Sequence, residues 1–371
     1  MSDWSAIDHR WMAQALRLAE RGLYTTNPNP RVGCVIAHGD RVVGEGWHQR
    51  AGEAHAEVHA LRESGEQARG ATAYVTLEPC GKHGRTPPCA DALIDAGIAR
   101  VVVASDDANQ HGGGALDRLA AAGIVVESGL MQAAARELNR GFFSRVERGR
   151  PWLRVKLGMS LDGRTALANG MSAWITGDAA RADVQRWRAR SSAILSGSGT
   201  VLSDNPRLTA RLSTDELATL VGVALATPLR VILDRELRTP ADAHVLDGDA
   251  PTLLLHDERL SPRNDPRFEH VAFAGCAVAD QRLDLRQALR LLAERGCNEV
   301  QVEAGPILSG ALFAAGLVDE LLIYIAPTLL GNDAHGLLNL PPLEKMSERW
   351  NLRVVDQRSV GDDLRLLLRP Q

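Results

Sequence analysis

Cysteine is scarce in this chain, and its distribution argues against a disulfide-based scaffold. Only five cysteines occur among 371 residues. An odd and widely spaced set is not typical of a disulfide framework in a chain this long, and it favours a reducing compartment. We therefore expect a cytoplasmic protein, with cysteines free for other chemistry at Cys34, Cys80, Cys89, Cys276 and Cys297.

The chain also lacks long apolar runs and long runs of charge of one sign. No segment approaches the apolar length of a transmembrane helix. The N-terminus, MSDWSAIDHRWMAQALRLAERG, is acidic at its start and amphipathic, unlike a secretory signal. The net charge is −4, whereas a general polyanion binder is usually basic, and no aromatic–basic stripe is evident. These features argue against a membrane or nucleic-acid partner.

The composition is otherwise that of a globular protein, with 45% hydrophobic and 24% charged residues. The length suggests two domains or one large one. Strands alternate with helices along the chain, which predicts sheets covered by helices, and the pattern pauses at RVERGRP near residues 145–151. We therefore expect two α/β domains, at 1–147 and 151–371. The clearest early elements are a helix at 8–22, a hairpin at 32–48 and helices at 55–64 and 87–97.

The most informative residues are His55, Glu57, Cys80 and Cys89. One imidazole and two thiolates suit a tetrahedral zinc whose fourth position stays open to water, as in a hydrolytic site. Glu57 is then free to carry a proton, and H-x-E followed by P-C-x-x-C is the signature of zinc nucleobase deaminases. Here the second cysteine follows nine positions after the first, instead of three.

A closed, structural zinc site is the alternative, and it needs a fourth protein ligand. His59 and His83 are the candidates. That arrangement would leave Glu57 without a function, and closed sites usually have more tightly spaced cysteines. We therefore expect one catalytic zinc per chain, with packing as the role of His59.

The strings TNPNPRVGCVI, HAEVHAL and EPCGKHGRTPPC make the reading more specific. They resemble the deaminase half of the bifunctional riboflavin-biosynthesis family known as RibD or RibG, and the resemblance extends over essentially the whole chain. The wide Cys80–Cys89 spacing is unlike that of cytidine, tRNA-adenosine and polynucleotide deaminases. The resemblance implies a cytidine-deaminase-like three-layer α/β/α fold for the first domain.

The same resemblance implies a set of substrate contacts for the deaminase. Similar proteins usually read Asp-Pro-Asn-Pro in one of these loops, where this chain has Asp107-Ala108-Asn109-Gln110. Other readings stay open, because Asn29-Pro30 is also a good turn, His48 could be a surface residue at a strand end, and Arg85 could simply be solvated. The implied contacts are Asn29 and His48 near the pyrimidine, Arg85 on the ribose phosphate, and Asp107 and Asn109 on the ribose side.

In the second half, VKLGMSLDGRTA, SAWIT, GTVLSDNPRLTAR and VEAGPILSGAL resemble the reductase half of the same family, whose fold is similar to dihydrofolate reductase. A glycine loop that opens a helix can offer N–H groups to a phosphate. The resemblance implies NADPH contacts at Gly158, Trp174, Thr200, Asp204, Gly305, Pro306, Ile307, Leu308, Ser309, Gly310 and Ala311. It implies substrate contacts at Ser172, Arg188, Leu208, Arg211 and Glu303.

These reductase residues also have ordinary structural readings. The loop that begins at Gly305 could be a plain strand–helix turn, Trp174 could lie in the core, and Arg188 and Arg211 could be surface arginines. As a pair, the two arginines would suit a ribose 5-phosphate, because guanidinium binds phosphate oxygens in a bidentate manner. Lys156 and Asp162 are further candidates near the transferred hydride.

The resemblance predicts a bifunctional enzyme that acts on small pyrimidine ribonucleotides. Hydrolytic deamination of 2,5-diamino-6-(5-phosphoribosylamino)pyrimidin-4(3H)-one would precede NADPH-dependent reduction of the ribosyl group to ribityl. We also expect a homo-oligomer, a dimer or a tetramer. Two alternatives remain: a zinc deaminase of nucleic-acid bases with a non-catalytic second domain, and a zinc-stabilised scaffold without activity.

Overall fold

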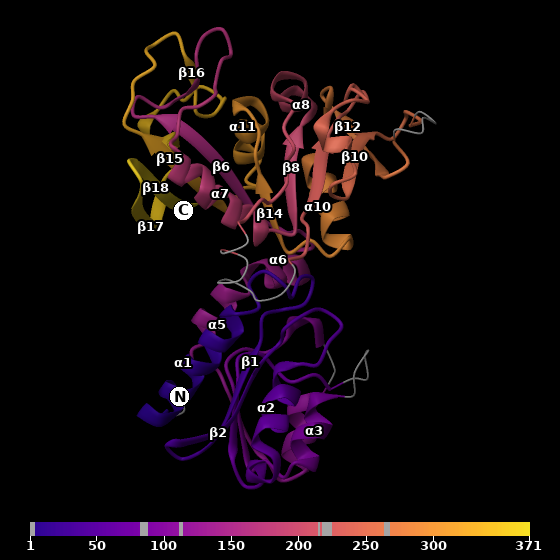
Figure 1. Ribbon diagram of the computed structural model, residues 1–371, viewed down its shortest axis with the longest axis vertical. Helices are drawn as coiled ribbons and strands as arrows, with labels where there is room; N and C mark the ends of the chain where they lie inside the picture. The colour runs from indigo at the N-terminus through magenta and orange to yellow at the C-terminus, as the bar shows by residue number, and fades with distance from the viewer. Residues whose placement is uncertain (1–3, 82–87, 111–113, 214–215, 217–224, 263–267) are drawn as a thin grey trace. The chain divides into compact units, whose positions relative to one another are not determined.

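The computed structural model describes residues 4–81, 88–110, 114–213, 216, 225–262 and 268–371 (Figure 1). The chain divides into two compact units. The main segment of the first unit is Met1–Arg148, and the second unit consists of Gly149–Glu216 with Ala226–Gln371. Each unit is built around its own sheet.

The first unit contains a five-stranded sheet in the order β2-β1-β3-β4-β5. Strand β1 runs antiparallel to both of its neighbours, and β3, β4 and β5 are parallel. The strands span Gly33–His38 (β1), Arg41–Trp47 (β2), Thr72–Val75 (β3), Arg100–Val103 (β4) and Val125–Ser128 (β5). The hairpin expected at 32–48 is confirmed, with its turn at Gly39 and Asp40.

Helices cover both faces of this sheet because alternate strand residues are buried on opposite sides. Ile36 and Val75 face one hydrophobic cluster with α2 and α3, while Val35 and Tyr74 face another with α1. Figure 1 shows α1 and α5 on one side of the sheet and α2 and α3 on the other, the three-layer arrangement that was expected. The helices are α1 (Ala6–Glu20), α2 (Ala56–Ser64), α3 (Cys89–Asp95), α4 (Ala115–Ala121), α5 (Gln132–Leu138) and α6 (Arg140–Arg148).

In the second unit the described strands form a nine-stranded sheet in the order β11-β10-β9-β8-β14-β6-β15-β18-β17. The pairs from β11 to β15 are parallel, and β18 adds to β15 in the antiparallel sense. The strands are β6 (Trp152–Ser160), β8 (Ala193–Gly197), β9 (Leu229–Leu233), β10 (Thr252–Asp257), β11 (Val271–Cys276), β14 (Glu299–Val302), β15 (Glu320–Ala326), β17 (Leu352–Val360) and β18 (Asp363–Pro370).

Helices also pack on both faces of the second sheet. One face buries Leu153, Val231 and Val300 against α10 and α11, and the other packs against α7 and α8. Parallel strands place the loops that follow them at one edge, and this edge carries the N-termini of α8 and α11. The helices are α7 (Asp178–Ala189), α8 (Ser198–Asp204), α10 (Leu285–Glu294) and α11 (Pro306–Ala314), with short pairs β7 (Arg164–Ala166) to β16 (His335–Gly336) and β12 (Val278–Ala279) to β13 (Arg282–Leu283).

The main departures from the sequence expectations lie near the centre of the chain and at its end. Residues 132–148, for which no helix was predicted and which run into the predicted pause at 145–151, form α5 and α6. Helix α7 and the antiparallel hairpin of β17 and β18 were not anticipated either. Within the described residues, no helix is long and apolar enough to cross a membrane.

Asp8 anchors α1 to the sheet of the first unit. Its carboxylate accepts hydrogen bonds from Ser5 at the helix N-terminus, from the Tyr74 hydroxyl at 2.9 Å and from Arg100 Nη1 at 2.6 Å. Burial opposes the charge, but these donors outweigh it and hold the pKa of Asp8 well below its ordinary value. Arg100 also pairs with Glu127 on β5, so one network joins a helix and three strands.

We predict that Asp8→Asn lowers the free energy of unfolding by about 1.5–3 kcal/mol, because hydrogen bonds to a buried charged group are lost. Asp117→Asn is the matched control, since Asp117 is also in the first turn of a helix but is exposed, and its loss should cost less than about 1 kcal/mol. Urea unfolding of the full chain measures both. Equal effects of the two substitutions would contradict this role.

Candidate metal and nucleotide sites

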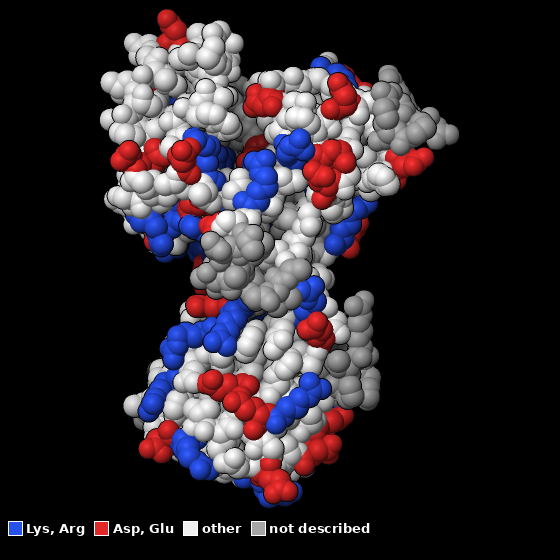
Figure 2. Space-filling model, viewed as in Figure 1, with Lys and Arg blue, Asp and Glu red and all other residues white. Residues whose placement is uncertain are grey.

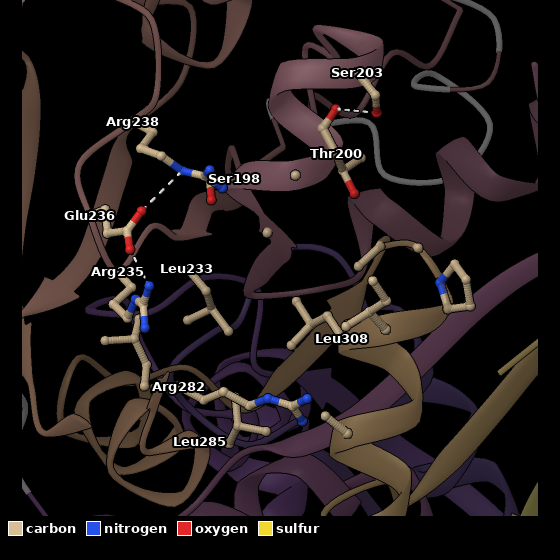
Figure 3. A pocket seen from close by; sticks show the side chains of 18 of the residues that line it. Ser198, Thr200, Ser203, Leu233, Arg235, Glu236, Arg238, Arg282, Leu285 and Leu308 are labelled. Atoms are coloured by element: carbon tan, nitrogen blue, oxygen red, sulfur yellow. Dashed lines mark hydrogen bonds and ion pairs between the residues drawn. The ribbon is translucent and has the colours of Figure 1, made fainter. Parts of the chain in front are cut away.

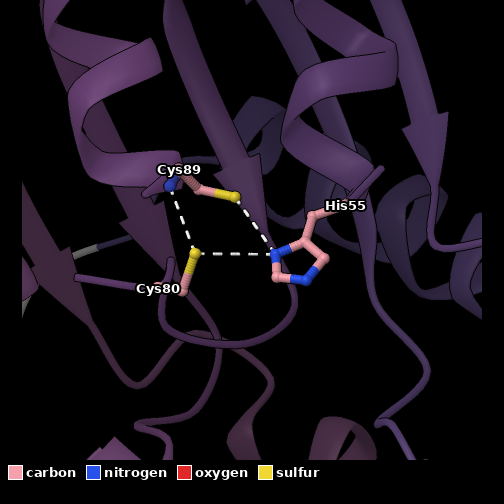
Figure 4. A group of neighbouring side chains, drawn as sticks. All are labelled: His55, Cys80 and Cys89. Carbon is pink, nitrogen blue, oxygen red and sulfur yellow. Dashed lines mark hydrogen bonds between the residues drawn. The ribbon is translucent and has the colours of Figure 1, made fainter. Parts of the chain in front are cut away.

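His55, Cys80 and Cys89 converge in the first unit, although 34 residues separate the first from the last. Their ligand atoms all lie within 4.8 Å of one another. His55 Nδ1 is 3.3 Å from Cys89 Sγ and 3.6 Å from Cys80 Sγ, and the backbone N–H of Cys89 donates to Cys80 Sγ at 3.2 Å (Figure 4). The three predicted ligands therefore form one cluster.

Local structure explains how these residues meet. His55 is the N-cap residue of α2, and Cys89 is the first residue of α3, directly after Pro88. Helix α2 lies very close to β2 because Gly46 has no side chain: an added Cβ there would be 2.2 Å from the Ala56 carbonyl oxygen. The glycine therefore sets the position at which α2 starts, and with it the position of the imidazole.

The cluster fits a zinc ion. Bond lengths of about 2.0 Å to nitrogen and 2.3 Å to sulfur, at tetrahedral angles, separate N and S by about 3.5 Å. The two observed N···S distances, 3.3 and 3.6 Å, bracket that value. Among the described residues this is the one group of such ligands that could hold a metal, and His59 is not part of it. The closed site through His59 is therefore not formed, and His83 lies outside the described residues.

The thiols are chemically unequal. The hydrogen bond from Cys89, aided by His55 and opposed by burial, lowers the pKa of Cys80 to about 4. The same contact and burial raise the pKa of Cys89, and the contact with Cys80 raises the pKa of His55. A low-pKa thiolate next to an imidazole is the donor set that soft divalent metals prefer.

Glu57 lies beside the ligands without being one of them. It is 3% exposed, and within the described structure its Oε2 has no hydrogen-bond partner. Burial raises the pKa of Glu57 above its ordinary value, although His55 acts in the opposite direction. A buried carboxylate of raised pKa next to a metal site is suited to accept and return a proton near neutral pH.

Two of the predicted substrate contacts lie next to this cluster. The His48 ring packs edge-on against His55 with centroids 5.3 Å apart, and His48 Nε2 is 3.0 Å from Asn29 Nδ2. His48 is 2% exposed, which rules out the surface reading. The backbone N–H of Asp107 donates to Glu78, and Asn109 is exposed. Arg85 lies outside the described residues.

The second unit holds a cavity of about 730 Å³ at the carboxyl edge of its sheet. Its lining combines β6 with α8, the start of α11 and one face of α7. Trp174 is 77% exposed, so the core reading of this residue is wrong. Of the residues predicted for the reductase, the cavity is lined by Lys156, Gly158, Ser172, Trp174, Arg188, Thr200, Asp204, Leu208, Arg211, Glu303, Gly305 and Pro306.

A charged triad forms one wall of this cavity. Arg188 makes a bidentate pair with Glu303, with both N···O distances 2.7 Å, and donates to the Thr209 carbonyl at 3.0 Å. Burial opposes the negative charge on Glu303, but Arg188 and then Lys156 lower its pKa to about 2. Burial lowers the pKa of Lys156, an effect that Glu303 partly offsets. The side chain of Arg188 is 12% exposed, so the alternative reading of this residue as a surface arginine is wrong.

The second unit has a second cavity of about 570 Å³, and Figure 3 shows side chains that line it. Thr200, Ser203, Gly305, Pro306 and His335 line both, so the two form one cleft along the carboxyl edge of the sheet. Ile307, Leu308 and Ala311, three further predicted cofactor contacts, line the second cavity. A long ligand could therefore extend through both.

Three predicted residues line neither cavity. Asp162 instead accepts hydrogen bonds from Ser160 and from the backbone N–H groups of Leu330 and Gly331, at 2.8–3.2 Å for the backbone bonds. Ser309 Oγ donates to the Ala304 carbonyl. Gly310 is at a close approach, because a Cβ there would lie 2.2 Å from the Asn339 carbonyl oxygen.

The structure adds residues that the sequence reasoning missed. Arg235, Glu236, Arg238 and Arg282 line the second cavity, and His335 lines both. Isolated arginines after a strand carry no distinctive spacing, so composition could not separate them from ordinary surface residues. The position of Arg235, two residues after the end of β9, was the one available signal, since loops at that edge bind ligands in parallel sheets.

Comparison with known proteins agrees with the two-unit division. Residues 5–105 match the cytidine and deoxycytidylate deaminase zinc-binding region, and residues 151–366 match the RibD C-terminal domain. Riboflavin biosynthesis protein RibD of Escherichia coli (strain K12) is 50% identical over 365 residues, covering 97% of this chain and 99% of that protein.

Solved structures agree along the whole chain. Acinetobacter baumannii RibD (form 2) is 42% identical, with a TM-score of 0.88 over 98% of this chain and 99% of that one. A Thermotoga maritima diaminohydroxyphosphoribosylaminopyrimidine deaminase/5-amino-6-(5-phosphoribosylamino)uracil reductase is 31% identical, with a TM-score of 0.84 and coverage of 98% and 99%. The fold expected for both halves is therefore confirmed.

We predict that the purified chain contains about one zinc per molecule, and that His55→Ala or Cys89→Ala removes most of it, because two remaining ligands hold the ion weakly. Cys297→Ala is the control, since Cys297 is also buried but lies in the second unit. Elemental analysis after dialysis measures the content. Full zinc occupancy in Cys89→Ala would refute the assigned ligand set.

We predict that Arg188→Gln lowers the stability of the second unit by about 3–5 kcal/mol at pH 7, because a buried carboxylate loses its partner. The pKa of Glu303 is about 2, below its ordinary 4.5, so the stabilisation is complete above about pH 4.5 and disappears as the pH falls towards 2. The Tm difference from the wild type should therefore shrink below pH 4.

Arg186→Gln serves as the control for this pH series. Arg186 is on the same helix and also pairs with a glutamate, but it is 46% exposed, so its loss should cost about 1 kcal/mol or less. A Tm difference for Arg188→Gln that stays constant from pH 3 to pH 8 would show that Glu303 does not depend on this arginine.

Proposed function

The chain belongs to the RibD family, whose members combine a zinc-dependent deaminase and a reductase in riboflavin biosynthesis, and we propose how its residues carry out these two reactions. The observation that carries the proposal is the buried Glu57 carboxylate beside the His55–Cys80–Cys89 cluster, in a chain whose second unit holds two cavities of about 730 and 570 Å³ that share lining residues. The substrate would be 2,5-diamino-6-(5-phosphoribosylamino)pyrimidin-4(3H)-one.

In the deaminase half, His55, Cys80 and Cys89 would hold zinc, which when bound supplies Lewis-acid activation of water. Glu57 takes a proton from the attacking water and returns it to the ring nitrogen of the pyrimidine. Glu57 then carries the remaining proton of that water from the new hydroxyl group to the exocyclic amine, the C–N bond breaks, and ammonia leaves, so that a carbonyl oxygen replaces the amine. The raised pKa of Glu57 allows it to accept and release the proton within this cycle.

The remaining contacts of the first half would orient the pyrimidine nucleotide. Asn29 and His48 support each other 3.0 Å apart beside the metal ligands, in a position suited to hydrogen-bond the heterocycle. Arg85 would bind the ribose phosphate. Asp107 and Asn109 would contact the ribose, in a loop held to the zinc side by the bond from Asp107 N–H to Glu78.

In the reductase half, the cleft would bind NADPH, whose nicotinamide supplies the hydride when the cofactor is bound. Helix α11 begins with no side-chain cap at Gly305 within the described structure, so its first N–H groups are available to phosphate oxygens. Gly158, Trp174, Thr200 and Asp204 would contact the cofactor along the shared lining. Ile307, Leu308 and Ala311 would contact it farther along, with Ser309 and Gly310 setting the packing of that helix.

The ribosyl substrate would occupy the wall with the charged triad. Glu303 and Arg188 would bind the sugar chain, with Ser172 and Leu208 beside them, and the exposed Arg211 would meet the 5′-phosphate. Lys156, whose pKa is lowered by burial, can donate a proton as the sugar is reduced. Asp162 acts at a distance, by holding the 330–331 backbone.

These assignments favour a free nucleotide over a base within a nucleic-acid strand.

The five cysteines, all in the described part of the chain, form no disulfide, which suits the reducing cytoplasm in which we place the protein. A homo-oligomer, as a dimer or tetramer, is part of the same proposal. Ammonia release from short RNA or DNA, and none from the nucleotide, would support the nucleic-acid alternative instead.

We predict that Glu57→Gln lowers ammonia release from the diaminopyrimidine ribotide about 10²–10⁴-fold, because the proton carrier is lost while the side-chain volume is kept. Reduction of added 5-amino-6-(5-phosphoribosylamino)uracil with NADPH should remain at the wild-type rate, and the zinc content should stay at its wild-type level. Unchanged deamination in Glu57→Gln would show that the mechanism is wrong.

A further inference from the structure

Charged side chains of both signs are intermixed on the face of the second unit that Figure 2 shows, and the polar group that the proposed reactions leave unexplained is a buried one. On β14, Val300 and Val302 pack in the apolar core with α10 and α11. The alternate residues, Glu299 and Gln301, face the other side of the sheet, and Glu303 follows at the carboxyl edge. Gln301 is fully buried and is not among the residues that line either cavity, so a ligand in the cleft does not touch it.

One end of the Gln301 amide is hydrogen-bonded and the other is not. Nε2 donates to Glu303 Oε1 at 2.8 Å, whereas Oε1 is buried without a hydrogen-bond partner among the described residues. Arg154, the register partner of Gln301 on β6, also has a buried Nη1 without a partner in that part of the chain. A buried amide oxygen without a partner costs stability. A methionine of similar length would avoid this cost, so packing alone does not explain a glutamine at this position.

The donors around Glu303 leave one acceptor position on its carboxylate. Each carboxylate oxygen can accept about two hydrogen bonds. Oε1 accepts from Arg188 Nε at 2.7 Å and from Gln301 Nε2, so it is saturated. Among the described residues, Oε2 accepts from Arg188 Nη2 alone, at 2.7 Å. Because Glu303 lines the larger cavity, the position left on Oε2 is the one that a ligand can use.

The two donors reach Glu303 from different parts of the fold. Arg188 reaches it from α7, whereas Gln301 lies on the strand that Glu303 follows. The Glu303 backbone is fixed as well, since its N–H donates to the Leu195 carbonyl at 2.9 Å and its carbonyl accepts from Ser196 Oγ at 2.7 Å. Gln301 therefore ties the carboxylate itself to the sheet, independently of α7.

We propose that Gln301 is a positioning residue of the reductase, which occupies Glu303 Oε1 and thereby directs Oε2 to a hydroxyl group of the ribosyl substrate. This inference rests on the proposed binding of the sugar chain by Glu303. A carboxylate that is already held on both oxygens loses little freedom when the substrate binds, which lowers the entropic cost of binding. Without Gln301 either oxygen can turn towards the cavity, and the sugar meets a less ordered acceptor.

The test separates substrate affinity from turnover and from folding. Gln301→Met keeps the length of the side chain and removes both the N–H donor and the unpartnered oxygen. Gln287→Met is the matched control, because Gln287 is a partly buried glutamine of the second unit that accepts a hydrogen bond from the Ala277 N–H at 2.7 Å and lines neither cavity. Reduction of 5-amino-6-(5-phosphoribosylamino)uracil by NADPH is measured in the full, zinc-loaded chain, together with ammonia release and Tm.

The KM for the ribosyl nucleotide should rise about tenfold in Gln301→Met, because a weakened charge-assisted hydrogen bond changes affinity by about that factor. The kcat and the KM for NADPH should change less than about twofold, since the lost interaction is made with the bound substrate before and during the reaction. The Tm should stay near or above that of the wild type, because Glu303 keeps its Arg188 pair and the unpartnered oxygen is gone. Ammonia release should be unchanged, and Gln287→Met should leave both KM values unchanged.

The outcomes that contradict the inference are distinct. An active reductase whose KM for the nucleotide is unchanged in Gln301→Met would leave the proposed function intact and remove Gln301 from it. A lower kcat and a lower Tm with an unchanged KM would assign Gln301 a structural role. A wild-type chain that does not oxidise NADPH with this nucleotide would overturn both this inference and the proposed reductase function.

Discussion

Parallel strand pairing is the constraint on which both sites depend. In each unit it directs the loops after successive strands to one edge of a sheet, so residues that are distant in sequence become neighbours. In the first unit the loop after β3 brings Cys80 to the start of α3. In the second, the segments after β8, β9 and β14 line one continuous cleft. Without that pairing, the ligands and the charged groups would have no common location.

The two sites use buried charge in opposite ways. In the first unit, Glu57 is buried, and one of its oxygens has no partner among the described residues. Burial raises the pKa of this carboxylate, which lies beside the candidate metal ligands. In the second unit, Glu303 is paired by Arg188 on both oxygens and stays ionised, with its pKa near 2. The first carboxylate is thereby suited to exchange protons, and the second is a negative charge that pairs with Arg188.

The candidate metal ligands could be predicted from the sequence, whereas much of the reductase half could not. His55, Glu57, Cys80 and Cys89 could be identified because metal ligation restricts residue type and spacing. Helix α7 was missed because its apolar positions are interrupted by five charged residues between Asp178 and Arg188. The β17–β18 hairpin was missed because β17 is exposed along most of its length, so it lacks the alternation that marks a strand. The positions of Arg235 and Asp162 could not be predicted from the sequence either. Only the folded chain shows that Arg235 faces a cavity and that Asp162 holds a loop.

The central claim is that one chain carries two consecutive reactions, and a single progress curve tests it. The zinc-loaded chain is supplied with the diaminopyrimidine ribotide and NADPH, and ammonia and NADPH are followed in the same sample. The account predicts that ammonia appears first and that one NADPH is then oxidised for each ammonia released. Ammonia release without any loss of NADPH, or NADPH oxidation that precedes ammonia, would contradict it.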